Sequence, residues 1–263
     1  MRIEFYQIGW YRAMHSYMIV FLFMEEFVMF VFRKAIVIIH GFTGNLYDNE
    51  FLMNYLEYDS KFDVYAETLP GHNQDRFSDA NINDWKKAID KQMEKLIRNG
   101  YRTIYIIGHS MGGILASYAA SKYKEVKKVV FVNAAFDYLN FKQNRKDIKD
   151  KDFSKYSHLW QKALRTSPFM VNEFRKLVKE GNIFIKKVNC DTLILRSTKD
   201  EIIPYDVGNT IFDNVNSKNK YLTDVIDASH VVLSGNKKEV TSEYIRLFLK
   251  GGRKWKKNYK KEI

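Results

Sequence analysis

The chain has 263 residues, of which 46% are hydrophobic, and it carries a net charge of +12. This length suits one globular domain with a small insertion, and a count of 3 prolines excludes proline-rich linkers. The single cysteine, Cys190, excludes an internal disulfide framework and fits a reducing compartment.

Residues 1–32 form an N-terminal extension with a strand-like apolar run at 17–32. Glu25 and Glu26 interrupt this run, so each half is too short to cross a bilayer. We expect one or two strands packed on the domain. A membrane-associated or cleaved segment is an alternative, although no small-residue cleavage site follows the run, and a later start at Met24 or Met29 is another.

From Lys34 onward, apolar runs alternate with amphipathic stretches. Strands are predicted at 35–41, within 62–72 before a turn at Pro70–Gly71, and at 102–108, 128–134, 192–197 and 220–227. Helices are predicted at 47–58, 83–99, 111–123, 206–215 and 237–250, and Asn83 is the predicted cap of the second. The alternation predicts an α/β fold in which residues 33–136 and 189–250 build a mostly parallel central sheet with helices on both faces.

Two segments depart from this alternation. Residues 137–188 are charged and mostly helical, and we expect them to form a small helical cap inserted on the sheet. Residues 251–263 form a basic tail, which we expect to be solvated beyond the last helix. Trp255 and Tyr259 among its lysines favour an alternative, a weak contact with an anionic membrane surface or with nucleic acid. We expect no obligate nucleic-acid partner, and the sequence leaves the oligomeric state open.

A G-x-S-x-G pattern, Gly108-His109-Ser110-Met111-Gly112, lies between a predicted strand and a predicted helix of small residues. Glycines two positions before and after the serine permit a sharp turn that lifts its hydroxyl clear of the sheet. The turn also places the Met111 N–H at the head of a helix, where negative charge is stabilised. The pattern predicts that Ser110 is a nucleophile, and an ordinary glycine turn is the alternative.

A serine nucleophile needs a base and an acid that orients the base. His230 lies between the last predicted strand and the last predicted helix, so it is the predicted base. Asp200 follows the buried run at 192–197. It is therefore expected at the carboxyl end of a strand, where open α/β sheets place their sites, and it is the predicted acid. Asp137, just past the preceding strand, is the runner-up.

The loop that follows the first core strand, His40–Gly44, is predicted to complete an oxyanion hole. We expect the Phe42 N–H to act as one donor and the Met111 N–H as the other. His40 is predicted to hold the backbone of this loop rather than to take part in catalysis.

Five segments stand in the order and spacing of bacterial carboxylesterases and monoacylglycerol lipases: HGFTGN (40–45), LPGHN (69–73), GHSMGG (108–113), RSTKDEIIP (196–204) and SHVVL (229–233). The chain resembles this family over about residues 33–250. The resemblance implies an α/β-hydrolase fold and a cytoplasmic serine esterase that needs no cofactor or metal. It also implies that the substrates are short- to medium-chain acyl esters or monoacylglycerols. Asn73 departs from the family, whose members often carry a glycine-rich turn there.

The cap is predicted to select the acyl chain, and Trp160, Phe169 and Phe174 are the predicted substrate-binding residues, with packing inside the cap as the alternative. The same three catalytic residues could serve a thioesterase, an aminopeptidase or a cofactor-free perhydrolase. An aminopeptidase would need acidic residues in the cap, where Glu173 and Glu180 occur. A non-catalytic lipid- or RNA-binding scaffold is a further alternative, which has no need of a serine, an aspartate and a histidine at these positions.

Overall fold

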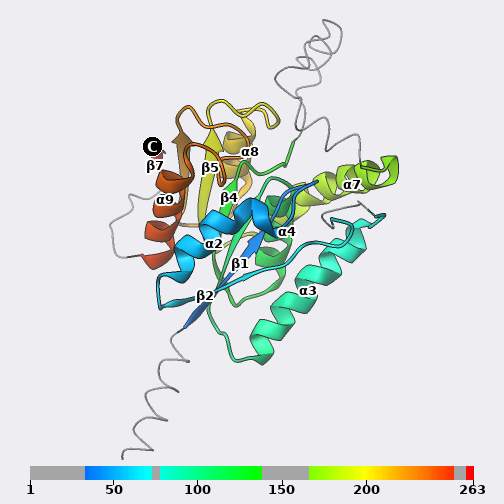
Figure 1. Cartoon of the computed structure of the whole chain (residues 1–263), viewed down its shortest axis with the longest axis horizontal. Coiled ribbons are helices and arrows are strands. Elements are labelled where there is room, and N and C mark those ends of the chain that lie inside the picture. Colours follow the sequence, from blue (N-terminus) through cyan, green and yellow to red (C-terminus); the bar gives the residue numbers. More distant parts are fainter. Residues whose placement is uncertain (1–32, 73–77, 138–165, 252–258) are drawn as a thin grey trace, which may run out of the picture.

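The computed structural model describes residues 33–72, 78–137, 166–251 and 259–263 (Figure 1). Seven strands of these ranges form one sheet in the order β2-β1-β3-β4-β5-β6-β7, and every neighbouring pair is parallel. The strands are β1 Lys34–Ile39, β2 Phe62–Ala66, β3 Ile104–His109, β4 Val126–Val132, β5 Asp191–Ser197, β6 Lys220–Val225 and β7 Tyr259–Glu262. The predicted α/β fold with a mostly parallel sheet is confirmed.

The order of the strands reverses at β1. The chain runs from β1 outward to β2 and then returns to the opposite side of β1 with β3. Ile39 at the end of β1 is paired with Gly108 near the end of β3, so the loops that follow these two strands start side by side. In open parallel sheets, a reversal of this kind opens a crevice at the carboxyl ends of the strands.

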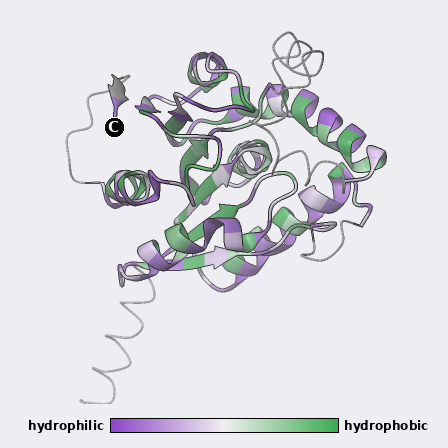
Figure 2. Cartoon of the chain, turned by 45° about the horizontal axis from the view of Figure 1, so that its top comes forward, coloured by the Kyte–Doolittle hydropathy of each residue, from purple (hydrophilic) through white to green (hydrophobic). Residues whose placement is uncertain are grey.

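Helices cover both faces of the sheet (Figure 1). They are α2 Glu50–Glu57, α3 Ile82–Arg98, α4 Met111–Lys122, α7 Pro168–Phe184, α8 Val207–Asn214 and α9 Lys238–Lys250, with 3₁₀ turns at Leu46–Asn49 and Ile185–Lys187. Helices α3, α4, α7 and α8 share one core with one face of the strands, and α2 and α9 share the other. Hydrophobic residues gather on the strands and on the inner sides of the helices (Figure 2).

The two cores follow from the alternation of side chains along each strand. In β1, Ala35, Val37 and Ile39 pack towards α3 and α4, whereas Ile36 and Ile38 pack towards α2 and α9. Because both faces are buried, β1 is a continuous apolar run rather than an alternating one. This is why the run is recognisable in the sequence.

The N-cap of helix α3 lies two residues before the predicted one. This N-cap is Asn81, whose side-chain oxygen accepts from the Asn83 and Asp84 N–H groups at 2.8 and 3.2 Å. The Asp84 carboxylate in turn accepts from the Asn81 N–H at 2.9 Å. The prediction of Asn83 was wrong because Asn81 and Asp84 stand three positions apart and form a reciprocal capping box.

The described part of the predicted cap is a helix of the core. In α7, Met170 and Leu177 are fully buried in the same cluster as Ile114 of α4. Residues 168–184 therefore pack as part of the helical layer on the sheet. Residues 138–165, with Trp160, lie outside the described residues, as does the N-terminal extension 1–32 with Met24 and Met29.

The last residues of the predicted solvated tail belong to the sheet. Strand β7 pairs with β6 in parallel, and the Ile263 N–H donates to the Asp224 carbonyl at 2.8 Å. This edge strand was not predicted from the sequence, although lysines are common on edge strands and their presence does not exclude one. None of the helices in the described ranges is both long and apolar enough to span a membrane.

Candidate active site

Ser110 lies at the turn between β3 and α4 with backbone angles φ 53° and ψ −119°. The flanking glycines have no room for a side chain. A Cβ on Gly108 would lie 2.3 Å from the carbonyl oxygen of Gly112, and a Cβ on Gly112 would lie 2.2 Å from that of Ile39. The predicted strand–turn–helix setting of the G-x-S-x-G pattern is therefore confirmed, together with the reason for its glycines.

Backbone hydrogen bonds hold the Ser110 turn in place. The Ser110 N–H donates to the Val132 carbonyl at 2.9 Å, and the Ser110 carbonyl accepts from Gly113 and Ala135 at 3.0 and 3.1 Å. A positive φ at a residue other than glycine costs on the order of 1 kcal/mol, so it persists where neighbours fix it. Here β4 and the loop after it supply two of these contacts.

His230 and Asp200 lie together at the carboxyl end of the sheet. His230 Nδ1 lies 3.0 and 2.9 Å from the two carboxylate oxygens of Asp200, and these side chains are 6% and 4% exposed. Asp200 Oδ1 also accepts from the Ile202 and Ile203 N–H groups, both at 2.8 Å. Because a carboxylate accepts only, Nδ1 carries the proton and Nε2 of the neutral ring is left as an acceptor. Asp137, the runner-up acid, is exposed.

The base loop lies against the nucleophile turn. The ring of His109, the residue before Ser110, has its centroid 5.0 Å from that of His230. The His230 carbonyl accepts from His109 Nε2 and from Asn133 Nδ2, both at 2.9 Å, and the His230 N–H donates to a Glu201 carboxylate oxygen at 3.0 Å. The backbone of His230 is thus held on both sides of its Cα atom.

Sequence reasoning did not single out Asn133, Glu201 or the ring of His109. Asn133 follows β4 with φ 45°. Asparagine is enriched at positive φ, so an asparagine directly after a buried strand was the available signal.

His40 holds the loop that follows β1, as predicted. Its Nδ1–H donates to the Gly41 carbonyl at 2.8 Å, and its Nε2 accepts from the Leu69 N–H at 2.9 Å. Burial lowers the pKa of His40 to about 3, so the ring is neutral and can hold both roles. A Cβ on Gly41 would lie 3.0 Å from the Cβ of Ser110, which places this loop directly beside the nucleophile.

Phe42 and Met111, whose N–H groups are the predicted oxyanion donors, are both anchored. Met111 is the first residue of α4 and is fully buried. The Phe42 ring stacks on Phe174 with centroids 4.8 Å apart and an interplanar angle of 12°, and Trp85 meets its edge at 6.3 Å. The Phe42 backbone is therefore fixed by its own side chain.

The predicted substrate-binding residues lie in different environments. Phe174 is 9% exposed and contacts Phe42, next to the candidate site. Phe169 is 46% exposed on the first turn of α7, and Trp160 lies outside the described residues. The acidic residues that an aminopeptidase would use are engaged with α3: Glu173 accepts from the Ile82 N–H at 3.2 Å, and Glu180 pairs with Lys86 at 2.9 Å.

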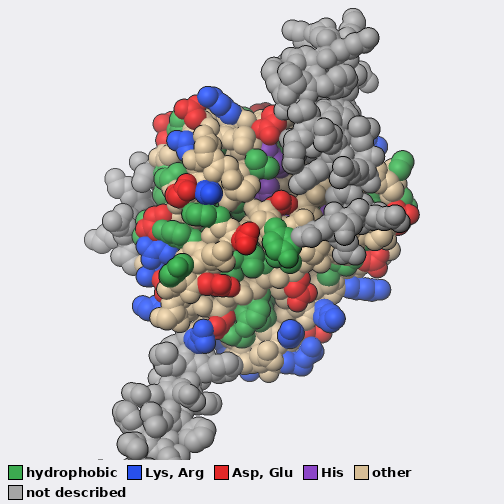
Figure 3. Space-filling model, in the orientation of Figure 1, with side chains coloured by type: hydrophobic (Ala, Val, Ile, Leu, Met, Phe, Trp, Pro, Cys, Tyr) green, Lys and Arg blue, Asp and Glu red, His purple; other side chains and the backbone are tan. Residues whose placement is uncertain are grey.

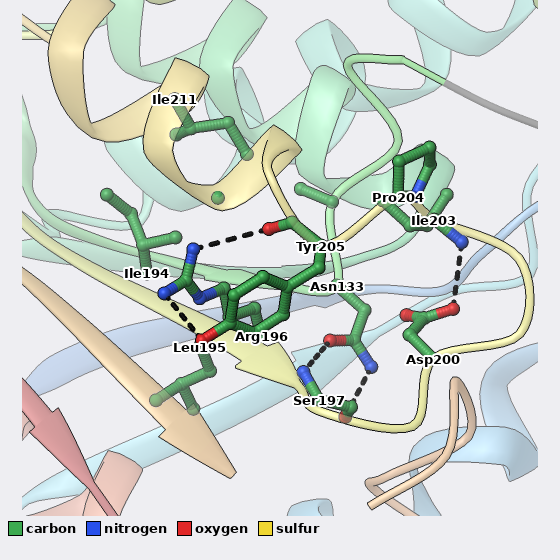
Figure 4. Close-up of a pocket in the computed structure, with 12 residues that line it drawn as sticks. Asn133, Ile194, Leu195, Arg196, Ser197, Asp200, Ile203, Pro204, Tyr205 and Ile211 are labelled. Carbon is green, nitrogen blue, oxygen red and sulfur yellow. Dashed lines mark hydrogen bonds between the residues drawn. The ribbon is translucent and has the colours of Figure 1, made fainter. Parts of the chain in front are cut away.

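Residues of β5 and α8, together with Asp200, line a pocket (Figure 4). Arg196 and Tyr205 close one side of it: the guanidinium lies 3.7 Å from the Tyr205 ring centroid and donates to the Tyr205 hydroxyl at 2.8 Å. Arg196 also pairs with Asp224 of β6. These contacts tie the acid loop to the sheet.

Within the described ranges, no three His, Cys, Asp or Glu side chains are grouped as a metal ion would require.

On the face drawn in Figure 3, histidine side chains reach the surface in one small area, between hydrophobic and acidic side chains. His40, His72, His109 and His230 are all buried, so little imidazole surface is open to solvent. Water is therefore largely excluded from these four imidazole rings. Electrostatic interactions are stronger in such a setting than at an open surface.

The buried histidines predict a loss of stability in mild acid. Burial lowers the pKa of His109 from 6.5 to about 4, and that of His40 to about 3. Between pH 6.5 and about 4 the unfolded chain binds protons that the folded protein does not, so the free energy of unfolding falls as the pH drops. Each such histidine contributes up to about 1.4 kcal/mol per pH unit.

Urea unfolding from about pH 7 to about pH 4.5 measures this effect. His109→Gln cannot titrate there, so its unfolding free energy is expected to vary with pH less steeply than that of the wild type. Carboxylates contribute equally to both proteins and cancel in the difference. Identical slopes would show that His109 does not stay neutral in the folded protein.

Comparison with known proteins agrees with the fold. A family model described as the alpha/beta hydrolase fold matches residues 34–182, more than half of the chain. A carboxylesterase of Bacillus subtilis (strain 168) is 20% identical over 231 residues, which are 82% of this chain and 92% of that protein. A thermostable monoacylglycerol lipase of Bacillus sp. (strain H-257) is 22% identical over 216 residues, 75% of this chain and 82% of that protein.

Solved structures show the same fold. The crystal structure of a monoacylglycerol lipase of Paleococcus ferrophilus superposes with a TM-score of 0.65 at 18% identity, covering 82% of this chain and 93% of that one. At this level of identity the likeness establishes the arrangement of helices and strands, and the chemistry has to be argued from the residues themselves.

Proposed function

Since the chain belongs to the α/β-hydrolase family, we propose that it is a serine carboxylesterase or lipase that hydrolyses short- to medium-chain acyl esters or monoacylglycerols. One observation carries the proposal: the strained turn of Ser110 lies against a buried His230 whose Nδ1 is hydrogen-bonded to Asp200. A serine on such a turn beside an oriented imidazole is the arrangement that acyl transfer requires. The carboxylesterase and monoacylglycerol lipase relatives point to the same class of substrate.

In the proposed reaction, Ser110 Oγ attacks the ester carbonyl carbon while His230 Nε2 takes the hydroxyl proton. The carbonyl oxygen becomes an oxyanion, for which the N–H groups of Phe42 and Met111 are the proposed donors. The C–O bond to the alcohol then breaks, and the alcohol leaves with the proton held by His230. Water, deprotonated by the same imidazole, attacks the acyl-enzyme and releases the carboxylic acid and the free serine.

Asp200 has a positioning and electrostatic role in this scheme. Its carboxylate keeps the proton of the neutral imidazole on Nδ1, so that Nε2 can accept the proton of Ser110, and it stabilises the imidazolium that forms. The two backbone N–H groups on its Oδ1 keep the carboxylate in one orientation. No proton is transferred to Asp200 in this scheme.

The apolar surface formed by Phe42 and Phe174 supports an acyl rather than a polar substrate group. We expect p-nitrophenyl esters with about two to sixteen acyl carbons to show the highest kcat/KM at short or medium length, because a pocket of fixed depth gains apolar contact until it is filled. The measurement is kcat/KM across this series.

The thioester and the anilide of the best acyl group test the chemical class. Both leave the acyl pocket unchanged, so differences in rate report on the leaving group alone. A thioester or an anilide cleaved faster than the ester would replace the esterase proposal with a thioesterase or an amidase. No turnover of any of the three would leave the scaffold alternative.

A further inference from the structure

The carbonyl oxygen of His230 has two side-chain donors from two different strand ends. His109 Nε2, at the end of β3, and Asn133 Nδ2, just after β4, each lie 2.9 Å from it. A carbonyl oxygen accepts two hydrogen bonds, so these donors saturate it. His109 and Asn133 are themselves buried, so water does not compete for either bond.

Asn133 also holds the strand that leads to the acid. Its Oδ1 accepts from the Ser197 N–H at 2.8 Å, and its Nδ2 lies 2.9 Å from the Ser197 hydroxyl oxygen (Figure 4). Ser197 is the last residue of β5, three positions before Asp200. One carboxamide therefore joins the strand end before the acid to the backbone of the base.

The backbone of Asn133 is strained, with φ 45°, and is kept so by its N–H bond to the Leu195 carbonyl at 2.9 Å. The strained conformation directs the side chain across the end of β5 towards His230. Strain that surrounding contacts maintain in this way is concentrated at functional sites.

His109 is suited to its contact because it is neutral. Burial lowers its pKa to about 4, and with the proton on Nε2 the ring donates to the His230 carbonyl. His109 directly precedes Ser110 in the chain. The strand end that carries the nucleophile thus also carries a donor to the residue that supplies the base.

We propose that Asn133 and His109 form a clamp on the His230 carbonyl and act as positioning residues, which keep the imidazole within reach of Ser110 and Asp200 at once. The clamp acts through His230 and touches no substrate. This inference rests on the proposed serine hydrolase function and extends it to two residues for which that function gives no role. Its consequence is that loss of the clamp lowers kcat and leaves substrate binding unchanged.

Two pairs of variants separate the hydrogen bonds from the bulk of the side chains. Asn133→Gly removes the carboxamide at a backbone angle that glycine adopts freely, and Asn133→Asp keeps the size but turns an oxygen towards the His230 carbonyl. His109→Phe fills the space of the ring without a donor. His109→Gln carries an amide N–H₂ that reaches about as far as Nε2.

We expect Asn133→Gly, Asn133→Asp and His109→Phe to lower kcat for ester hydrolysis about 10²-fold, since displacing a reacting group by about 1 Å has that effect, with KM changed less than about threefold. His109→Gln is expected to retain kcat within about fivefold of the wild type. A purely structural role would not separate kcat from KM, nor glutamine from phenylalanine.

Thr223→Val is the matched control. It removes a buried side-chain hydrogen bond, Thr223 Oγ1 to the Tyr244 hydroxyl at 3.1 Å, on β6 away from the clamp. Its kcat is expected to equal that of the wild type. If Asn133→Gly does not fold, the comparison of His109→Phe with His109→Gln is sufficient to test the clamp.

Hydrogen exchange of the loop at 227–235, measured by mass spectrometry on the full chain, tests the clamp without depending on enzymatic activity. We expect faster exchange there in Asn133→Gly than in the wild type or Thr223→Val, because the loop opens more readily once a tether is lost. A wild type that hydrolyses esters beside an Asn133→Gly with unchanged kcat overturns the clamp and leaves the proposed function standing. A wild type that hydrolyses no ester overturns the proposed function. In that case, an exchange rate at 227–235 that is the same in Asn133→Gly and in the wild type also overturns the clamp.

Discussion

Ser110→Ala is expected to lower kcat for p-nitrophenyl ester hydrolysis at least ~10³-fold, as removal of a serine nucleophile does in triad enzymes. Without the Oγ atom no acyl-enzyme can form, and the remaining rate comes from a water molecule attacking beside the oxyanion donors. Alanine and serine have similar backbone preferences, so the φ of 53° and the fold are expected to persist. Steady-state kinetics with a parallel thermal melt provide the measurement.

Ser117→Ala is the control for Ser110→Ala. Ser117 is also a buried serine of the β3–α4 region, and its Oγ donates to the Ile114 carbonyl at 2.6 Å. It is expected to keep full activity and to show whether loss of a buried hydroxyl alone affects turnover. Equal activity in Ser110→Ala and the wild type would rule out Ser110 as the nucleophile.

Asp200→Asn is expected to lower kcat by ~10³- to 10⁴-fold, the scale seen when an orienting aspartate becomes asparagine. The asparagine Oδ1 still accepts from the Ile202 and Ile203 N–H groups, so the loop is kept. Its N–H₂ group then faces His230 Nδ1, which has to accept and so loses its proton to Nε2. A ring protonated on Nε2 cannot take the proton of Ser110.

Asp137→Asn tests the alternative acid in the same assay. Asp137 is exposed, whereas Asp200 lies 2.9 Å from the His230 ring, so this variant is expected to stay within about twofold of wild-type kcat. The reverse result, a large loss at Asp137 and a small one at Asp200, would transfer the orienting role to the loop after β4.

The candidate site was largely predictable because its residues occupy positions that the fold makes special. Ser110 needs glycine on both sides, and His230 and Asp200 each follow a buried apolar run, so periodicity and glycine spacing indicate them. The positions of β1 and β3 follow from apolar runs that are buried on both faces.

Other features could not be predicted, because they depend on contacts between segments distant in the chain. Asn133 meets His230 across 97 positions, and His109 meets it across 121. Strand β7, with the sequence YKKE, has no apolar run and is defined by its pairing with β6. Helix α7 is charged along its outer side, and its core role depends on Met170 and Leu177 meeting α4.

The parallel arrangement of the sheet has a consequence for how the protein acquires its structure. No neighbouring pair among the described strands can form as a hairpin. Val132 of β4, for example, pairs with Leu195 of β5, and helix α7 lies between these two strands in the chain. Folding is therefore governed by long-range contacts, which makes it slow and leaves apolar strands exposed in intermediates. Low temperature and chaperones during production should then raise the yield of folded protein more than they would for a helical bundle of equal size.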